Sequence, residues 1–400
     1  MKILWVKAGQ LLPVDTGGKI RTYNILKQLV LRHEVTLLSY YGGPRDAVYD
    51  DALRSQFPLA EPMADCWPAS LPGLAVKYAR WLPTSMPFAV GKFTARAVHE
   101  RIASGCAAGR FDVALCDFLA PTANFPDALP VPTVLFQHNV ESALWARQAL
   151  HERNALKRPI YRLEAHRMAA YEAAAVRRFD HVIAVSEHDK AQMSKWVDAG
   201  NISVTPTGVD LAQFRAGAPD PAEARPLVVF VGSMDWEPNE DGILWFHREV
   251  WADVLAAVPS AMLRIVGRRP PPAIASLAGG AIEVTGTVPS VVEHLHAAAV
   301  VIVPLRIGGG TRLKIYEAMA ARRPVVATAI GAEGLDYRSG GDIVVADSSG
   351  DFANAVIGLL RDPARRSAVG LAAQARAAKY DWPNVVGTFA ATLRDVRRRA

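Results

Sequence analysis

The chain has 400 residues, half of them hydrophobic, which is enough for two domains of ordinary size, each with its own core. Its net charge of +6 lies mostly in residues 1–215, and without a binding motif this modest excess does not indicate a nucleic-acid partner. The three cysteines, Cys66, Cys106 and Cys116, are odd in number and lack a metal-binding spacing. This pattern argues against a disulfide framework and favours a reducing, cytoplasmic location.

Residues 1–7 have too short an apolar part for a signal peptide, and no run of 18 apolar residues predicts a transmembrane helix. In the first half, apolar β-branched runs predict strands and periodic patterns predict helices between them. The strands are expected at 2–6, 33–39, 113–116, 133–137, 181–185 and 202–205, and the helices at 19–31, 92–107, 142–178 and 187–197. The region 42–90 is rich in proline and glycine, and we assign no element there.

Two basic stretches in the first half carry interleaved aromatic and apolar side chains. The segment 145–178 has a net charge of +5, and its pattern predicts a long helix that is broken near Pro159. A second basic and aromatic stretch spans residues 77–96. Such patches can contact an anionic membrane surface. The alternative, which we favour, is a solvated helix face above core aromatic residues.

The second half begins after a predicted linker and repeats the alternation of strand and helix. Residues 216–226 contain three prolines and no large apolar residue, and we place the linker at 211–226. Strands are expected at 227–231, 262–266, 282–285, 300–303, 324–327 and 342–345, and helices at 240–257, 290–297, 311–321, 351–361 and 363–378. The predicted fold class is therefore α/β, with two doubly wound parallel-sheet domains at 1–210 and 227–381.

A glycine-rich loop after the strand at 300–303 is the strongest candidate for a ligand site. Three consecutive glycines without side chains let a ligand approach the backbone closely: Gly308, Gly309 and Gly310. Thr311 is a residue type that caps helices, and Arg312 adds a cation beside the free N–H groups of the first helical turn. Such a helix start favours an anion, so we expect a phosphate group here.

The helix after this loop adds a second cation, Lys314, and a carboxylate one turn further on, Glu317. Glu317 lies among alanines, where its two oxygens could accept hydrogen bonds from the hydroxyl groups of a ribose. Phosphate at the helix start and ribose one turn later would form a nucleotide site. The alternative is an ordinary glycine turn with Lys314 and Glu317 as a surface ion pair.

Glycine and polar residues follow most of the predicted strands, where open parallel sheets bind their ligands. In the first half these are Gly17, Gly18, His138, Glu187 and Gly208, and in the second half Gly232, Ser233, Gly267, Arg268, Gly286 and Arg306. With two such sheets, the two edges could face each other across a cleft.

These features together resemble the retaining glycosyltransferases of family four, which have two Rossmann-like domains (the GT-B fold). The resemblance covers nearly the whole chain, through the motifs at 15–21, 182–187, 207–210 and 229–234 and most strongly through 317–321 with 324–327. A member of this family would also send its last helix, here about 382–400, back across the first domain.

The resemblance implies a glycosyltransferase that uses a nucleotide-diphosphate sugar as co-substrate, retains the anomeric configuration, and requires neither a metal ion nor a separate cofactor. The acceptor would be a glycan or a lipid-linked molecule of the cell envelope, reached in the cytoplasm at the inner face of the plasma membrane. We expect His138 to touch the transferred sugar and, with Arg312 and Lys314, to act in the reaction. The residues expected to bind substrate or donor are Gly17, Gly18, Glu187, Gly232, Ser233, Arg268, Val288, Arg306, Gly309, Gly310, Thr311 and Glu317.

The sequence departs from the family pattern at three positions. The first of the family's two glutamates is absent, because Gly309 stands in its place. Ser233 and Pro238 occupy the positions where the family carries an arginine and a lysine. We expect Arg312 and Lys314 to replace that phosphate clamp, with Arg268 or Arg306 as the next candidates.

Two other functions remain open. Nucleotide-sugar epimerases of the non-hydrolysing kind share the two-domain architecture, and the missing glutamate also fits a binding protein that has lost catalysis. The sequence does not indicate the sugar, the base, the acceptor or the oligomeric state.

Overall fold

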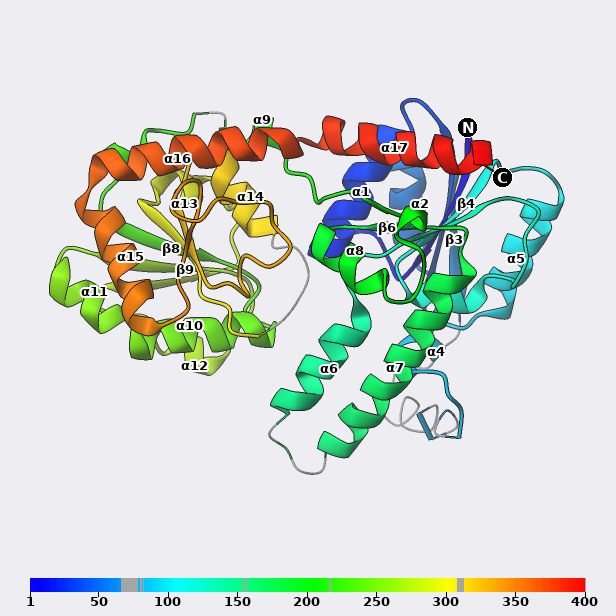
Figure 1. Ribbon diagram of the computed structural model, residues 1–400, viewed down its shortest axis with the longest axis horizontal. Coiled ribbons are helices and arrows are strands. Elements are labelled where there is room, and N and C mark those ends of the chain that lie inside the picture. Colours follow the sequence, from blue (N-terminus) through cyan, green and yellow to red (C-terminus); the bar gives the residue numbers. More distant parts are fainter. Residues whose placement is uncertain are drawn as a thin grey trace. The chain divides into compact units, whose positions relative to one another are not determined.

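The computed structural model describes residues 1–65, 78, 79, 81, 83–152, 154, 157–215, 217–307 and 313–399 (Figure 1). The predicted site residues Gly309, Gly310, Thr311 and Arg312 lie outside the described residues. The chain divides into two compact units, Met1–Pro206 with Trp382–Ala400, and Thr207–Asp381. Each unit is a parallel sheet with helices on both faces, so the predicted α/β fold class is confirmed.

The first unit contains a seven-stranded parallel sheet in the order β3-β2-β1-β4-β5-β6-β7. Its strands are β1 (Lys2–Ala8), β2 (Glu34–Gly42), β3 (Ala60–Asp65), β4 (Val113–Asp117), β5 (Thr133–Phe136), β6 (His181–Ala184) and β7 (Ile202–Val204). All six strands predicted in this half are present. The additional strand β3 and the helix α2 (Ala47–Gln56) lie in the region 42–90, where the sequence pattern allowed no assignment.

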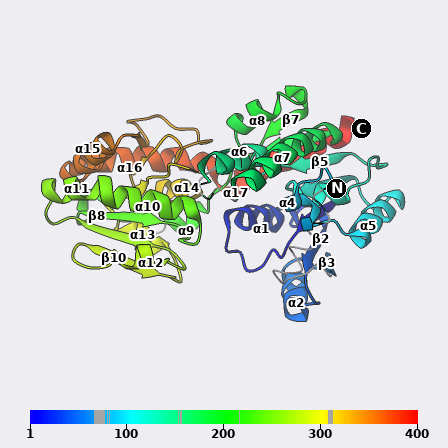
Figure 2. The ribbon, with the colours of Figure 1, turned by 90° about the horizontal axis from the view of Figure 1, so that it is seen from below.

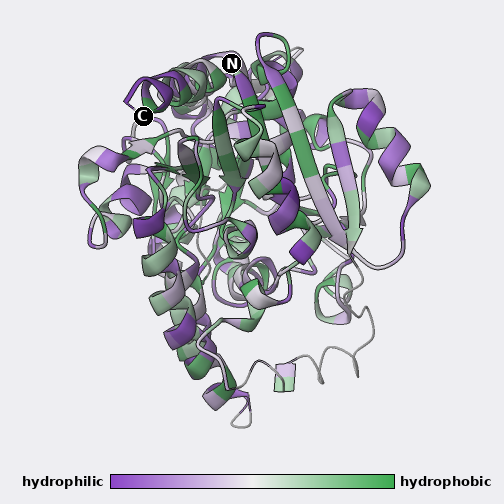
Figure 3. Ribbon diagram, turned by 90° about the vertical axis from the view of Figure 1, so that its right-hand side faces the viewer, coloured by the Kyte–Doolittle hydropathy of each residue, from purple (hydrophilic) through white to green (hydrophobic). Residues whose placement is uncertain are grey.

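The helices of the first unit are α1 (Gly17–Leu29), α2, α4 (Phe88–Gly91), α5 (Arg96–Ala107), α6 (Glu141–His151), α7 (Arg158–Arg178), α8 (Glu187–Met193) and α17 (Trp382–Arg399). The helix predicted at 142–178 is interrupted near Pro159, as expected. Pro159 lies in the first turn of α7, where a proline removes no helical hydrogen bond. The helices α6 and α7 form a hairpin that projects from this unit and carries both hydrophilic and hydrophobic residues (Figure 3).

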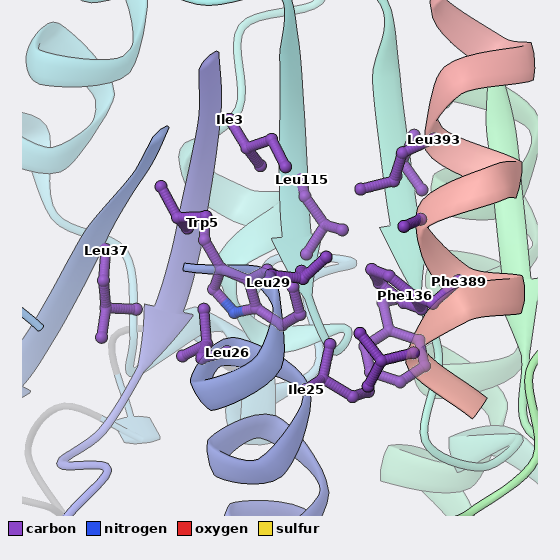
Figure 4. Packing of buried hydrophobic residues seen from close by; sticks show 14 of the residues in the cluster. Ile3, Trp5, Ile25, Leu26, Leu29, Leu37, Leu115, Phe136, Phe389 and Leu393 are labelled. Atoms are coloured by element: carbon purple, nitrogen blue, oxygen red, sulfur yellow. The ribbon is translucent and has the colours of Figure 1, made fainter. Parts of the chain in front are cut away.

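The core of the first unit forms between β1, α1 and α17 (Figure 4). The strand β1 is a nearly continuous apolar run because it lies inside the sheet and is covered on both faces. Trp5 of β1 packs against Phe389 of α17, with ring centroids 5.7 Å apart. The C-terminal helix thus supplies core residues to the N-terminal unit, nearly 400 positions away from the strand that it covers.

The second unit contains six parallel strands in the order β10-β9-β8-β11-β12-β13. Figure 2 shows β8 and β10 of this sheet together with the helices of the unit. They are β8 (Leu227–Val231), β9 (Met262–Val266), β10 (Ile282–Gly286), β11 (Val300–Val303), β12 (Val325–Ala327) and β13 (Val344–Val345). The helices are α9 (Leu211–Arg215), α10 (Glu237–Glu249), α11 (Trp251–Ala257), α12 (Pro272–Ala275), α13 (Val292–Ala297), α14 (Leu313–Ala320), α15 (Ser349–Arg361) and α16 (Pro363–Ala377). The helix predicted at 240–257 is two helices that meet at Val250.

The predicted linker at 211–226 is anchored to the second unit over its described residues. Two buried arginines hold it through backbone carbonyl groups. Arg323 donates to the carbonyl of Pro219, and Arg366 donates to those of Pro221 and Ala222 at 2.7 and 2.9 Å. This proline-rich stretch therefore packs as part of the second unit.

Within the described part of the chain, no helix combines the length and the apolar character that crossing a membrane requires.

Candidate active site

At the carboxyl edge of the first sheet, the glycine loop after β1 meets a histidine after β5. Gly17 and Gly18 are the first two residues of α1, and His138 lies two residues beyond Phe136, the last residue of β5. A side-chain carbon at position 18 would lie 3.4 Å from Nδ1 of His138. The structure therefore brings together two of the motifs predicted from the sequence, through the strand order that places β5 near β1.

His138 contacts a residue that the sequence prediction did not include, Asp117 at the end of β4. Nε2 of His138 lies 2.8 Å from Oδ1 of Asp117, and both side chains are buried. The oxygen approaches off the axis of the ring N–H, and neither atom has another hydrogen-bond partner among the described residues. An aspartate directly after the predicted strand 113–116 was the signal that could have identified it.

The charges around this pair determine both protonation states. Burial lowers the pKa of His138 to about 4 despite the opposing charge of Asp117, so the imidazole is neutral at pH 7. Burial alone would raise the pKa of Asp117, but the charge of Lys7, 3.5 Å away, and the contact with His138 outweigh it. The pKa of this carboxyl therefore lies below its usual value, and Asp117 is ionised.

A buried cation and a second buried carboxylate lie close to the pair. Arg21 of α1 is only 5% exposed. Burial lowers its pKa to about 10, although the charges of Asp189 and Asp117 act to raise it. Asp189 is buried in the first turn of α8, where its backbone N–H donates to the side chain of Ser186. Glu187, the residue predicted from the sequence, is exposed on the same turn.

A titratable carboxyl also lies three residues beyond His138, at the start of α6. Burial, with the nearby charge of Glu172, raises the pKa of Glu141 to about 7. Glu172 itself is fully buried and accepts hydrogen bonds from the backbone N–H groups of Glu141 and Ser142. The hairpin of α6 and α7 is therefore fastened at its base by a carboxylate of α7 that binds the free N–H groups of α6.

In the second unit, Lys314 of α14 is held at the carboxyl edge of the sheet. Its Nζ atom donates to Oδ1 of Asn239 at 2.8 Å and lies 4.4 Å from the ring centroid of Phe230 in β8. A side-chain carbon at Gly232 would lie 2.7 Å from this Nζ atom. The glycine after β8 thus leaves the space that the ammonium group of the lysine occupies, although 82 residues separate them.

The two arginines predicted as replacement cations are both bound to other side chains. Nε of Arg268 donates to Oγ of Ser233 at 2.6 Å and lies 3.8 Å from Asp235. Arg306 forms a bidentate ion pair with Asp241, at 2.5 and 3.0 Å. The charge of Arg306 is therefore neutralised within the protein, whereas Arg268 lies beside Ser233, where the family pattern has an arginine.

Glu317 lies one turn after Lys314 on α14. Among the described residues its carboxylate has no hydrogen bond and no ion pair. Burial raises its pKa to about 7, with the charge of Lys314 acting in the opposite direction. A partly buried carboxylate without a partner is suited to accept hydrogen bonds from a ligand. Val288, the other predicted contact, is half-buried after β10.

Over the described ranges, no group of three or more histidine, cysteine, aspartate or glutamate side chains is arranged to hold a metal ion. Among the described residues of the second unit, Lys314 and Arg268 are two cations near the carboxyl edge of the sheet, bound to Asn239 and Ser233 respectively.

Each of the two units matches a known protein family. The family model described as Glycosyltransferase Family 4 matches residues 16–213, and the model described as Glycosyl transferases group 1 matches residues 225–362. The D-inositol 3-phosphate glycosyltransferase of Rhodococcus opacus is 28% identical over 237 residues, covering 53% of this chain and 52% of that protein. The corresponding protein of Nocardia farcinica is 29% identical over 239 residues, with coverages of 53% and 51%. The chain thus spans about half the length of the curated relatives it matches.

Solved structures of the same fold cover the entire chain. Sucrose-phosphate synthase of Thermosynechococcus elongatus aligns over 100% of both chains with a TM-score of 0.70 and 18% identity. HepE of Anabaena, in complex with UDP and glucose, covers 98% of this chain and 99% of its own, with a TM-score of 0.65 and 15% identity. With the two family models together spanning most of the chain, these observations establish that the chain belongs to the family-four glycosyltransferases and has the GT-B fold.

Proposed function

We propose that this glycosyltransferase moves a sugar from a nucleotide-diphosphate donor to an acceptor, with net retention of the anomeric configuration and without a required metal ion. The observation that carries this proposal is the pair on α14: a lysine held at the sheet edge and, one turn later, a carboxylate that has no hydrogen bond or ion pair with the described residues. The phosphate and the ribose of a nucleotide present the matching groups, an anion for the lysine and two hydroxyl donors for the carboxylate. The UDP in the HepE complex supports the same class of donor.

The leaving nucleotide diphosphate gains negative charge as the sugar becomes oxocarbenium-like. Fixed cations aimed at that charge stabilise the transition state more than the ground state. We assign this role to Lys314 and to Arg312 of the glycine loop. Replacing Arg312 by alanine should cost about 2–4 kcal/mol of transition-state stabilisation, the range for losing one preorganised donor. Unchanged turnover and donor affinity would instead point to Arg268, since Asp241 already neutralises Arg306.

The first unit would supply the groups that contact the transferred sugar and the acceptor. In this proposal Gly17 and Gly18 allow close approach, His138 touches the sugar, and Glu187 supports the site from α8. In the second unit Val288 would hold the base through its backbone, and Gly232 and Ser233 would border the phosphates.

An NMR assay of the product decides the reaction class and its stereochemistry. The α or β configuration of the new linkage, compared with that of the donor, should be unchanged, and an inverted product contradicts the mechanism. Incubation with donor alone separates the two alternatives, because an epimerase converts it without acceptor. Tight donor binding without turnover over many acceptors would indicate a binding protein. A thermal-shift screen of nucleotide sugars identifies the donor to use.

Metal independence is tested separately, by measuring turnover with excess EDTA. We expect the rate to persist, because protein cations supply the positive charge. A loss of turnover that manganese or magnesium restores would contradict this part of the proposal.

For the acceptor we propose a glycan or lipid-linked molecule, met at an anionic membrane surface on the cytoplasmic side. The hairpin of α6 and α7 supports this, since it exposes Leu150 by 81% and Ile160 by 46% beside Lys157 and Arg158. Flotation with liposomes of anionic lipid should show binding that salt weakens. No binding, or binding indifferent to salt, favours the alternative of a solvated helix face.

A further inference from the structure

The two oxygens of Asp117 have different surroundings. Oδ2 accepts a hydrogen bond from the indole N–H of Trp5 at 3.1 Å and from the hydroxyl of Thr22 at 2.8 Å, and it lies 3.5 Å from Nζ of Lys7. Oδ1 lies 2.8 Å from Nε2 of His138 and has no hydrogen bond with other described residues. Three donors therefore fix one end of the carboxylate and leave the other end directed at the imidazole.

This arrangement determines which ring nitrogen carries the proton. An ionised carboxylate can only accept, and two lone pairs would repel each other at 2.8 Å, so the proton lies on Nε2. Since the imidazole is neutral at pH 7, Nδ1 holds a lone pair and can only accept a hydrogen bond.

The plane of the ring is fixed as well. Phe136 meets the imidazole edge to face, with centroids 4.7 Å apart, and Phe118 lies against it at 5.1 Å with an interplanar angle of 31°. Phe118 has a φ of +78°, in the left-handed region that is unfavourable for a residue with a side chain. Nδ1 lies at Gly18, where a side chain would contact it. A strained residue beside Asp117 thus helps to hold the acceptor nitrogen at the glycine loop.

We propose that Asp117 is a positioning residue for His138, which holds the imidazole so that Nδ1 accepts a hydrogen bond from a hydroxyl group of a substrate at the Gly17–Gly18 loop. This inference rests on the proposed function, because the hydroxyl belongs to the transferred sugar or to the acceptor. It also limits the substrate: the transferred sugar or the acceptor must present a free hydroxyl group there, one that can donate.

The variant Asp117→Asn tests this because it keeps the shape and reverses the hydrogen bond. Trp5, Thr22 and Lys7 all donate, so the amide oxygen takes the place of Oδ2 and the amide N–H group faces Nε2. The proton should then move to Nδ1, which could no longer accept. We expect kcat/KM to fall about 10- to 100-fold, as when the residue that orients a ligand histidine is removed.

The spectroscopic test is ¹⁵N NMR of histidine-labelled protein, which shows the ring nitrogen that carries the proton. The His138 signals are those missing from His138→Gln. We expect the proton on Nε2 in the wild type and on Nδ1 in Asp117→Asn. Asp180→Asn is the matched control: this exposed aspartate accepts from Thr133 at the opposite end of β5, and its variant should change neither tautomer nor kcat/KM.

A proton on Nδ1 in the wild type, or the same tautomer in both proteins, would overturn the positioning role. A tautomer that switches without a loss of kcat/KM would overturn the role of Nδ1 as the acceptor for substrate. A wild-type chain that transfers no sugar from any nucleotide donor refutes the proposed function and the substrate part of this inference. The NMR measurement on the unliganded protein decides the role of Asp117 in either case.

Discussion

The carboxyl edges of the two sheets place charged groups in opposite ways. In the first unit, Asp117 is buried and surrounded by Lys7, Trp5, Thr22 and His138, so its charge is balanced within the protein. In the second unit, Glu317 has no hydrogen bond or ion pair from the described residues. The carboxylate at the first edge is balanced by groups of the protein, whereas the one at the second edge is left for a ligand to satisfy.

This difference indicates how each unit contributes. A network in which buried charges have partners carries a small free-energy penalty. It also holds the imidazole ring in a single orientation, which suits the recognition of a particular hydroxyl group. An unpaired, partly buried carboxylate costs stability until a ligand arrives, which suits the binding of a donor that must also leave. Substitutions at the first edge should therefore affect folding, and substitutions at the second edge should affect ligand binding.

The largest effect is expected from Asp117→Ala. Removing this carboxylate leaves the buried Lys7 and two hydrogen-bond donors unpaired, so the free energy of unfolding should fall by about 3–5 kcal/mol. Urea denaturation followed by tryptophan fluorescence, which includes the buried Trp5, measures it. Asp127→Ala is the control, because this side chain is 96% exposed in its ion pair with Arg178 and should cost less than about 1 kcal/mol. Equal effects of the two substitutions would show that the buried network around Asp117 stabilises the fold no more than an exposed ion pair does.

Lys314→Met should leave folding intact and lower turnover. Methionine preserves the contact with Phe230 but removes the charge that we propose binds the donor phosphates, so we expect a loss of about 2–4 kcal/mol in transition-state stabilisation, measured as kcat/KM. Steady-state kinetics give the loss, and circular dichroism verifies the fold. Lys379→Met, at an exposed lysine of the same unit, should behave as the wild type. A loss of stability without a change in kcat/KM would show that Lys314 is structural.

Gly232→Ala tests the position of Lys314 while leaving its charge in place. The added carbon would lie 2.7 Å from Nζ of Lys314 and 2.8 Å from Nδ2 of Asn239, so both side chains must move. We expect the dissociation constant for the donor to rise about tenfold, or ~1.4 kcal/mol, by isothermal titration calorimetry. Gly350→Ala is the control, because nothing lies within 4 Å of its added carbon. An unchanged dissociation constant would mean that Lys314 binds the donor equally well from a displaced position.

The smallest effect is expected in the pH dependence of folding stability that Glu317 causes. Its pKa is about 7 in the folded chain and 4.5 in the reference state, so the folded protein keeps a proton that the unfolded chain releases. Stability of the unliganded protein should therefore decrease as pH rises from about 4.5 to 7. We expect Glu317→Gln to reduce this decrease by an amount of the order of 1 kcal/mol, allowing for partial exposure.

The affinity for the donor should show the opposite dependence on pH, because an ionised carboxylate accepts hydrogen bonds from hydroxyl groups more strongly than a protonated one. Wild-type donor affinity should increase between pH 6 and 8, and Glu317→Gln should bind weakly and independently of pH in that range. Thermal unfolding with and without donor measures both trends. Identical pH profiles for the two proteins would contradict the proposed ribose contact.

The chain's local patterns were sufficient for most of the fold and for part of the site. The continuous apolar runs of β1, β8 and β11 identify interior parallel strands because both of their faces are covered. The helix at 240–257 was predicted as one element because periodicity does not reveal the break at Val250. The strand β3 was missed because glycine and proline around it obscure the alternation, and pairing with β2 stabilises it.

For this protein, the sequence alone determined the alternation of strand and helix, and it identified His138, Lys314 and Glu317 as residues that follow strands or begin a helix. These features are local, because backbone preference and side-chain periodicity are properties of neighbouring residues. Only the tertiary structure decided that Asp117 contacts His138, that Asn239 and Gly232 position Lys314, and that Asp241 neutralises Arg306. Those partners come together through the order of strands in each sheet, which depends on long-range packing that no single segment encodes.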